Sequence, residues 1–445
     1  MSTSAIITAP GGLPLLGHAL QFRRDPLAFF EFLRDEGDIV SIELGPQRAY
    51  VLSSPDLIHE VLVAQARLFD KGAQIQGARD LFGNGLVASE GAEHRRQRLM
   101  MQPAFRRDRI ANYAGVMREE VASHVDYWYD GRTFDVRVEM TSLALAVAAK
   151  TLIASEVGEK LATEVKYGMP RLLELFFRRM TSPVPALKRL PLPGNREYDA
   201  ILKRFHGLVD GVIADNKRDS TPRNDLLSML LAERGEDGEP LSDRAIHDQL
   251  IAIIVAGSET TAALLSWVFH VFGEYPEIEA RVHTELDDVL DGRPAEYTDL
   301  PRLTYTANVV SETLRLYPPA WIVTRRSRAE VELGRYRIPA GADVLMSPYA
   351  VQRDPRFFTN ATTFDPDRWS RDRIAAVPRR AMLQFGSGVR KCIGEDFAVV
   401  EGTLALAIIA GRWRLRPDPG SRMQKIAAST YTPRNLVMVA QERHR

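Results

Sequence analysis

Cysteine is nearly absent from this 445-residue sequence, which contains only Cys392. A single cysteine excludes an intrachain disulfide, a cysteine-ligated iron–sulfur cluster and a cysteine-rich zinc site. An excess of charge of one sign is also lacking, because lysine plus arginine and aspartate plus glutamate both number 58. With a formal net charge of zero, no overall basic field indicates a nucleic-acid partner.

The N-terminal residues lack the features of a targeting segment. Residues 1–12 contain no basic region, and no apolar run near the N-terminus reaches the ~18 residues that a membrane span needs. We therefore expect no membrane anchor, no secretion signal and a cytoplasmic location. The chain also lacks a linker, a repeat and a low-complexity tract, so we expect residues 1–445 to form one domain.

The most informative segment is the glycine-rich loop Phe385–Gly394, which contains Cys392. One cysteine is enough to ligate a heme iron, because the porphyrin supplies the other four donors and the thiolate is the metal-binding form. The glycines let the backbone turn sharply. The apolar run at residues 396–410 predicts a helix whose N-terminal dipole favours an anion at the sulfur. The alternative is a buried structural cysteine.

Three other residues of this loop suit a heme-binding thiolate. Arg390 and Lys391 are cations next to Cys392, and a neighbouring cation favours the thiolate. Arg390 also suits a carboxylate such as a heme propionate. Phe385 is placed to shield the sulfur from water.

Four motifs together resemble the cytochrome P-450 family of heme-thiolate monooxygenases. The cysteine loop matches the pattern Phe-x-x-Gly-x-Arg-x-Cys-x-Gly at Phe385, Gly388, Arg390, Cys392 and Gly394. The others are Ala-Gly-x-acid-Thr at Ala256–Thr260, Glu-x-x-Arg at Glu312–Arg315 and Pro-Asp-Arg-Trp at Pro366–Trp369. Each motif is weak alone, but four in the family's order are a strong signal.

The resemblance implies a mainly α fold with a small β-rich lobe, which we expect from about residues 38–53 and 320–350. It implies heme b between a long central helix and the cysteine-loop helix, with Cys392 as the axial ligand. The implied reaction inserts one oxygen atom of O2 into a C–H bond. We expect no fused electron-transfer module, so the implied partners are a ferredoxin and an NAD(P)H-dependent ferredoxin reductase, and we expect a monomer.

Glu312 and Arg315 are three residues apart, hence on one face of a predicted helix. The resemblance adds Arg368, which gives a buried acid between two guanidinium groups. Such an acid must be fully paired, so removal of one member is expected to be severe. The alternative is a surface ion pair worth less than ~1 kcal/mol.

Residues 248–269 are apolar nearly all round, which predicts a long central helix. Gly257, Glu259 and Thr260 are expected to interrupt it with a flexible point and two polar groups. The resemblance implies that O2 binds at this widened turn and that Glu259 and Thr260 relay protons to it. The alternative is a kinked core helix whose threonine bonds the carbonyl four residues before it.

Several cations are candidates for the heme propionates. His94 and Arg98 are four residues apart on a predicted helix, and Arg325 resembles another propionate contact, with Arg326 left open as the alternative. The alternative for His94 is an ordinary surface histidine. Arg95, Arg96 and Lys391 are interpreted as a solvated basic face that attracts an acidic electron donor.

The resemblance implies a substrate pocket lined by residues 71–90, residues 172–192, the central helix and the segment after the Glu-x-x-Arg helix. The candidate lining residues are Phe176, Phe177, Ala252, Ile253, Ala256, Trp321, Ile322 and Val323. Apart from Glu259, no charge on the inner helix would anchor a carboxylate, which favours an uncharged, compact hydrophobic substrate. The alternative for Phe176 and Phe177 is plain helix packing.

Five short stretches also resemble bacterial enzymes that oxidise cyclic terpenes in specialised metabolism. They are Gly17-His-Ala-Leu, His94-Arg-Arg-Gln-Arg-Leu, Met101-Gln-Pro-Ala-Phe, Leu190-Pro-Leu-Pro-Gly-Asn-Arg and Ile246-His-Asp-Gln. The leading hypothesis is therefore a terpene monooxygenase. The alternatives are a fatty-acid or macrolide hydroxylase, a peroxide-driven enzyme and a non-catalytic heme sensor or carrier.

Overall fold

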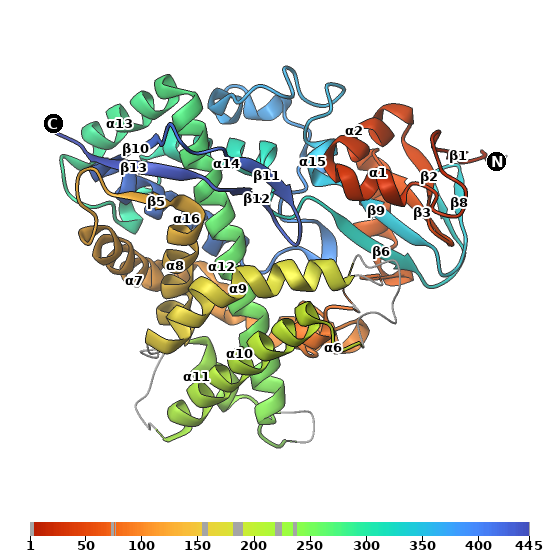
Figure 1. The fold of residues 1–445 in the computed structure, drawn as a ribbon, viewed down its shortest axis with the longest axis horizontal. Helices are drawn as coiled ribbons and strands as arrows, with labels where there is room; N and C mark the ends of the chain where they lie inside the picture. The colour runs from red at the N-terminus through yellow and green to blue at the C-terminus, as the bar shows by residue number, and fades with distance from the viewer. Residues whose placement is uncertain are drawn as a thin grey trace.

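The computed structural model describes residues 4–72, 75, 77–153, 159–180, 190–218, 225–234 and 238–444. Figure 1 shows a large helical region beside a smaller β-rich region that contains the N-terminus. The predicted fold class, mainly α with a small β-rich lobe, is confirmed. Two of the segments expected to line the substrate pocket are only partly described. Residues 73, 74 and 76 of the segment 71–90 and residues 181–189 of the segment 172–192 lie outside the described residues.

The helices account for most of the described chain. They are α1 (Ala19–Arg24), α2 (Pro26–Glu36), α3 (Pro55–His59), α5 (Arg79–Phe82), α6 (Gly91–Met101), α7 (Arg107–Asp126), α8 (Val136–Ala148), α9 (Glu159–Met180), α10 (Pro193–Arg218), α11 (Leu226–Ala232), α12 (Asp243–Glu274), α13 (Pro276–Leu290), α14 (Thr304–Leu316), α15 (Pro348–Val351) and α16 (Glu395–Arg412).

The strands are short. They are β1 (Ile7–Thr8), β2 (Ile39–Leu44), β3 (Gln47–Leu52), β4 (Phe69–Asp70), β5 (Thr133–Asp135), β6 (Val323–Ser327), β7 (Val331–Leu333), β8 (Tyr336–Ile338), β9 (Asp343–Met346), β10 (Trp413–Pro417), β11 (Gln424–Ala427), β12 (Tyr431–Arg434) and β13 (Val437–Glu442).

The largest sheet builds the β-rich lobe. Its strand order is β1-β2-β3-β9-β6-β4, so it joins the N-terminal hairpin to strands almost 300 residues later in the chain. Strands β2 and β3 are antiparallel with Ile39 opposite Leu52, and β3 runs parallel to β9. Buried side chains such as Leu52, Phe69 and Met346 form the core under this sheet.

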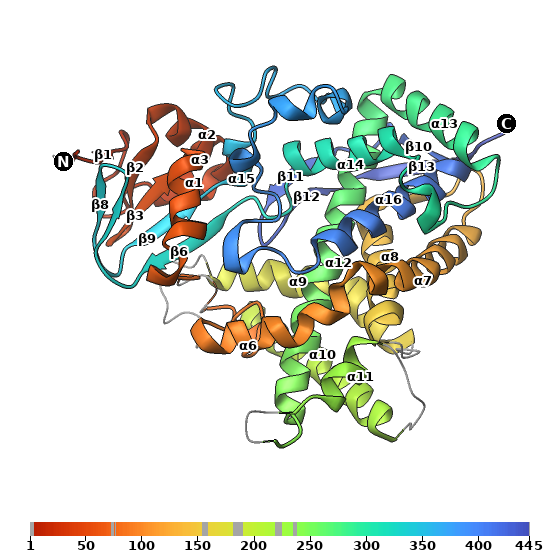
Figure 2. The ribbon, with the colours of Figure 1, turned by 180° about the vertical axis from the view of Figure 1, so that it is seen from behind.

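Helix α12 passes through the centre of the helical region (Figures 1 and 2). It begins after Ser242, whose hydroxyl accepts a hydrogen bond from the Ala245 backbone N–H at 3.2 Å, a typical N-cap. It is the one helix in the described part of the chain long and apolar enough to cross a membrane, but 78% of the qualifying 18-residue window is buried inside the protein. Gly257, Glu259 and Thr260 all lie within α12, which continues as an α-helix for 32 residues.

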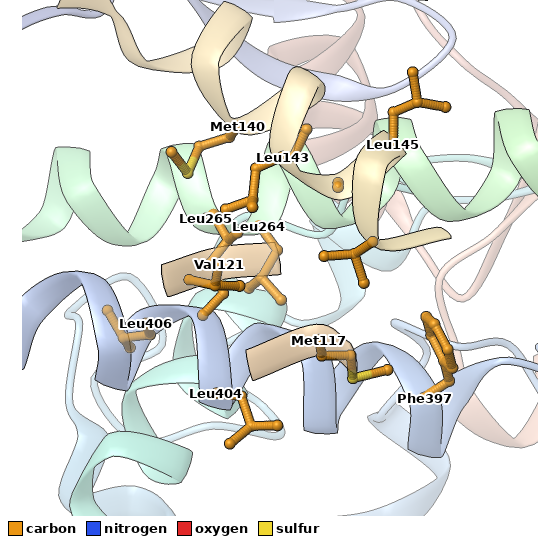
Figure 3. Packing of buried hydrophobic residues seen from close by; sticks show 14 of the residues in the cluster. Met117, Val121, Met140, Leu143, Leu145, Leu264, Leu265, Phe397, Leu404 and Leu406 are labelled. Atoms are coloured by element: carbon orange, nitrogen blue, oxygen red, sulfur yellow. The ribbon is translucent and has the colours of Figure 1, made fainter. Parts of the chain in front are cut away.

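The main hydrophobic core joins α12 to α7, α8 and α16. Figure 3 shows Met117 and Val121 of α7, Met140 and Leu143 of α8, Leu264 and Leu265 of α12, and Leu404 and Leu406 of α16 in this core. At Gly402 a Cβ atom would lie 2.8 Å from Leu264 Cδ2, so α16 approaches α12 closely there. The packing fixes the start of α16, and hence the cysteine loop, relative to the middle of α12.

The C-terminal hairpin of β11 and β12 also contacts α12. The Trp267 indole N–H donates to the Tyr431 carbonyl at 3.0 Å, and the two rings lie 4.8 Å apart. The turn of this hairpin places Thr430 next to Glu259 of α12. Residues separated by 171 positions in sequence thus meet at the middle of α12.

Candidate functional site

The cysteine loop forms a tight turn ahead of α16. The Cys392 N–H donates to the Phe385 carbonyl at 2.9 Å, and α16 begins at Glu395. Gly388 has φ +71°, and a Cβ atom there would lie 2.1 Å from the Leu62 carbonyl oxygen. The loop therefore needs glycine at this position, both for the backbone angle and for its contact with the β-rich lobe.

The surroundings of Cys392 have opposing effects on the pKa of its thiol. Its side chain is accessible to solvent, yet protein atoms crowd the sulfur, and this burial raises the thiol pKa above its usual value. A hydrogen bond from the Gly394 N–H and the charges of Arg98 and Lys391 act in the opposite direction, while Glu395 adds to the increase. The charges of Arg98 and Lys391 therefore favour the thiolate, but they do not outweigh the effect of burial. A bound iron would supply the missing charge, since a coordinating thiol loses its proton.

A cluster of buried and half-buried cations lies near the cysteine loop. It consists of Lys71, Arg98, Arg325 and Arg390, and His94 lies among them. The His94 side chain is 7% exposed, and burial lowers its pKa to about 4, with the four neighbouring cations lowering it further. The alternative of a surface histidine is thus wrong. Arg98 donates to the Lys391 carbonyl at 2.7 Å, which links α6 to the cysteine loop.

The carboxylate that pairs with this cluster is Glu90. Glu90 accepts hydrogen bonds from the Arg390 guanidinium at 3.0 Å and from the Lys71 backbone N–H. Arg390 also donates to the Phe69 carbonyl at 2.8 Å. Burial lowers the pKa of Lys71 to about 7; Glu90 opposes this shift, whereas Arg390 and Arg325 add to it. One carboxylate among so many cations leaves an excess of positive charge in a poorly solvated place.

Arg325 shows most clearly that this cluster fits an anionic group. Its side chain is 8% exposed, and its Nε is buried with no hydrogen-bond partner among the described residues. Burial lowers its pKa to about 10. Arg326, by contrast, donates to both Asp343 oxygens, at 2.9 and 2.8 Å. The structure therefore favours Arg325 over Arg326, and the cations together fit the propionates of a heme ligated by Cys392.

Glu312, Arg315 and Arg368 meet in a buried ionic network. The side chains of Glu312 and Arg315 are 0% exposed, and Arg315 donates to both Glu312 oxygens at 2.7 and 2.8 Å. Arg368 donates to Glu312 at 3.4 Å, and Trp369, the last residue of the Pro-Asp-Arg-Trp motif, donates to it at 2.9 Å. The surface ion-pair alternative is wrong. Backbone carbonyls of the segment 352–363 accept the remaining guanidinium hydrogen bonds.

The two polar residues of α12 do not bond to each other. The Thr260 hydroxyl donates to the Ala256 carbonyl at 2.7 Å, which is the local bond considered as the alternative. Glu259 is 8% exposed, and burial raises the pKa of its carboxyl. Its Oε2 lies 3.4 Å from the Thr430 hydroxyl. Their role as a proton relay remains a prediction.

Three of the expected pocket residues belong to the core instead. Trp321 is 1% exposed, its ring lies 6.4 Å from Phe22 and 6.1 Å from Phe30, and its indole N–H donates to the Ala428 carbonyl. Ala252 is 1% exposed beside Gly85, and Phe176 is buried in the main core. The alternative of helix packing is therefore correct for Phe176, and Trp321 and Ala252 are packed among protein side chains as well.

The other candidate lining residues have more access to solvent. Ala256 is exposed, and Phe177, Ile253, Ile322 and Val323 are partly buried. Ile253 packs against the main core, whereas Phe177 and Ile322 pack against the cluster that contains Trp321. Val323 is the first residue of β6, next to the second core.

Sequence reasoning missed a second buried acid, Glu401 of α16. Its Oε2 accepts a hydrogen bond from the Thr261 hydroxyl at 3.2 Å, and burial raises its pKa to about 8. The sequence pattern that indicates it is a single glutamate within the apolar run 397–410. As for Glu259, a carboxyl group on an apolar helix is expected to be buried and to need a partner. No comparable pattern marked Lys71 or Glu90, because their environment depends on contacts distant in sequence.

The chain is similar to known proteins over nearly its whole length. The family model described as Cytochrome P-450 matches residues 8–442. Pentalenene oxygenase of Streptomyces avermitilis is 45% identical, with 96% of each chain covered. Cyclooctatin synthase and cyclooctat-9-en-7-ol 5-monooxygenase, both of Streptomyces melanosporofaciens, are 44% and 43% identical, each covering 98% of this chain and 95% of its own.

A solved structure shares the fold. The crystal structure of the cytochrome P450DA heme domain superimposes with a TM-score of 0.88 at 25% sequence identity, covering 100% of this chain and 99% of that one. A heme-thiolate cofactor, separate redox partners and small hydrophobic substrates are features of the family. On the extent of the family match and of these alignments, the chain belongs to the cytochrome P-450 family and is a monooxygenase.

Proposed function

We propose that this monooxygenase hydroxylates a compact cyclic terpene in bacterial specialised metabolism. The observation that carries the proposal is the near-complete alignment, at 43–45% identity, with enzymes named for pentalenene and cyclooctat-9-en-7-ol, both cyclic terpenes. The partly buried candidate lining residues, Phe177, Ile253, Ile322 and Val323, are all apolar, which suits a hydrocarbon. We also propose that residues 1–445 form one domain that acts as a cytoplasmic monomer.

We assign roles in this reaction to the predicted site residues. Cys392 would ligate heme b, which when bound supplies the chemistry of O2 activation and oxygen insertion. His94, Arg98, Arg325 and Arg390 would hold its propionates. The protein orients the substrate and excludes water, while a ferredoxin and its NAD(P)H-dependent reductase deliver electrons.

Substrate class can be tested with the purified heme-loaded protein. Pentalenene and cyclooctat-9-en-7-ol are expected to displace water from the heme and shift its spin state, because apolar lining favours apolar ligands. Each is then incubated with a ferredoxin, its reductase, NADPH and ¹⁸O2, and the products are analysed by mass spectrometry. A terpene product with one ¹⁸O atom is expected.

Lauric acid and a macrolide aglycone serve as the competing substrates. A spin shift and product with either of these, but with neither terpene, would contradict the terpene assignment and favour the other hydroxylase class. Heme binding without product from any of the four compounds would favour the sensor or carrier class.

Thr260→Ala is expected to uncouple electron use from product formation. We assign the Thr260 hydroxyl the role of passing protons onward, so its loss should lower product per electron by roughly a hundredfold and divert electrons to hydrogen peroxide. Thr260→Ser retains the hydroxyl and should behave like the parent protein. The measurement compares NADPH consumed, product formed and peroxide released. Full coupling in Thr260→Ala would refute the relay assignment.

A further inference from the structure

A polar pocket of about 450 Å³ lies on the side of Glu259 next to the C-terminal hairpin. Its walls come from α8, α9 and the β11–β12 hairpin, and α12 contributes Glu259. The charged or hydroxylic wall residues that matter here are Asp135, Arg137, Arg171, Glu174, Thr430 and Arg434. A polar space of this size holds on the order of ten waters at about 30 Å³ each. The apolar candidate residues of the substrate site do not line this pocket.

The carboxyl group of Glu259 is turned toward this pocket. Its Oε2 lies 3.4 Å from the hydroxyl of Thr430, which stands in the hairpin turn. Its Oε1 is buried and has no hydrogen-bond partner among the described residues. The neighbouring Thr260 hydroxyl is instead bonded to the Ala256 carbonyl. A buried polar oxygen without a partner at the wall of a polar pocket is a place where water binds.

The other charges of the pocket are largely paired with one another. Arg171 donates to Glu197 at 2.7 Å and to Glu174 at 3.1 Å. Arg434 lies 3.9 Å from Glu174. Asp135 caps α8 by accepting a hydrogen bond from the Val138 N–H. These groups therefore leave little net field at Glu259.

Arg137 differs from these paired residues. Arg137 lines the pocket, and its guanidinium has no hydrogen bond or ion pair with another described residue. Burial raises the pKa of Glu259, and the charge of Arg137, followed by the Thr430 hydrogen bond, acts in the opposite direction. Arg137 is thus the cation whose field favours a Glu259 carboxylate.

We propose that Arg137 and Thr430 are positioning residues for Glu259, and that Glu259 takes up protons from water in this pocket. Thr430 holds the carboxyl toward the pocket, and Arg137 stabilises the anion that remains when a proton has been passed on. Without this cation, an isolated carboxylate on a buried helix would be too unfavourable to form in each turnover. The inference rests on the proposed relay role of Glu259 and extends it to the source of the protons.

The proton balance of the reaction requires such a supply. Hydroxylation consumes one substrate C–H bond, O2, two electrons from the redox partner and two protons, and it yields one hydroxylated product and one water. Each proton moves from pocket water to the Glu259 carboxyl and from there toward the Thr260 hydroxyl. The carboxyl returns to its starting state after each transfer, so no further reactant is needed.

The first test measures the protonation of Glu259 directly. Infrared spectra of the heme-loaded protein are expected to contain a C=O band of protonated Glu259, which is identified by its loss in Glu259→Gln and is followed against pH. Arg137→Gln is expected to move the midpoint upward by about one pH unit, a tenfold change in proton affinity, because the anion loses its cation. Arg137→Lys should keep the parent midpoint. Arg178→Gln removes an exposed arginine of α9 paired with Glu174 and should also leave it unchanged.

The role of the Thr430 hydroxyl is tested separately. Thr430→Val should raise the midpoint of the Glu259 band, whereas Thr430→Ser, which retains a hydroxyl, should have the parent midpoint. An unchanged midpoint in both Arg137→Gln and Thr430→Val would overturn the proposal. This readout needs no product, so it stands even if the substrate assignment fails.

The second readout is the solvent isotope effect on turnover. If pocket water supplies the protons, Arg137→Gln should increase the ratio of product formed in H2O to that in D2O at least twofold, and it should raise the share of peroxide. Arg178→Gln should change neither quantity. Parent-like isotope effects and coupling in Arg137→Gln would overturn the assigned proton route, even if the infrared midpoint moves.

Discussion

Glu312→Gln is expected to destabilise the folded protein by about 3–5 kcal/mol. The substitution removes the anion between Arg315 and Arg368, whose side chains are 0% and 6% exposed, so bulk water does not compensate for the lost charge. Two guanidinium groups would then face each other without a counter-charge. The predicted loss is a large fraction of the 5–15 kcal/mol that stabilises a typical domain. Urea unfolding followed by circular dichroism measures the change.

Glu332→Gln is the matched control. Glu332 pairs with Arg337 at 3.5 Å, but its side chain is 68% exposed, so its loss should cost less than about 1 kcal/mol. A similarly small loss of stability in Glu312→Gln would mean that burial does not increase the energetic contribution of the ion pair. The network would then have no special role in the fold.

Cys392→Ser is expected to abolish monooxygenase activity, with turnover reduced at least ~100-fold, equivalent to about 2.7 kcal/mol or more in the barrier. The thiolate donates electron density to the heme iron and favours O–O cleavage, which a serine oxygen does far less well. The absorption spectrum should change at the same time. Turnover of the terpene substrate and the optical spectrum are both measured.

Val389→Ala is the control for Cys392→Ser, because Val389 is 62% exposed in the same loop and its side chain contributes little to the packing. Its heme spectrum should match that of the parent protein. Parent-like turnover in Cys392→Ser would show that the sulfur is not the ligand on which catalysis depends.

The parts of the site that could be predicted from the sequence are those encoded by local spacing. The cysteine, the glycine at 388 and the Glu312–Arg315 pair each lie in a short motif, so the residues that must act together are neighbours in the chain. The motif with Trp369 likewise contained a member of the ionic network, although its contact with Glu312 became visible only in the structure.

The parts that could not be predicted depend on long-range contacts. Glu90 pairs with Arg390 across 300 residues, and Thr430 reaches Glu259 across 171. Trp321 was assigned to the pocket because it follows the Glu-x-x-Arg helix, but the aromatic cluster with Phe22 and Phe30 buries it on another side. Whether an apolar residue lies in the core or lines a pocket depends on which other segment packs against it, and sequence periodicity does not reveal that segment.

The unbroken course of α12 through Gly257 depends on two opposing effects, the low helix propensity of glycine and the packing of the helix against its neighbours. Glycine in a helix costs about 1 kcal/mol relative to alanine, so Gly257 is a locally weak point of the helix. The buried residues on both sides, from Ile254 to Trp267, pack against α8 and α16 and favour an unbroken helix. Tertiary packing therefore outweighs local propensity here.

The central claim is that the sulfur of Cys392 ligates a heme iron. It is tested most directly by the absorption spectrum of the purified, dithionite-reduced protein after addition of carbon monoxide. We predict the strongly red-shifted Soret band typical of a thiolate-ligated heme. A stable, heme-containing protein whose carbon monoxide complex shows only the unshifted band of a neutral axial ligand would contradict the account.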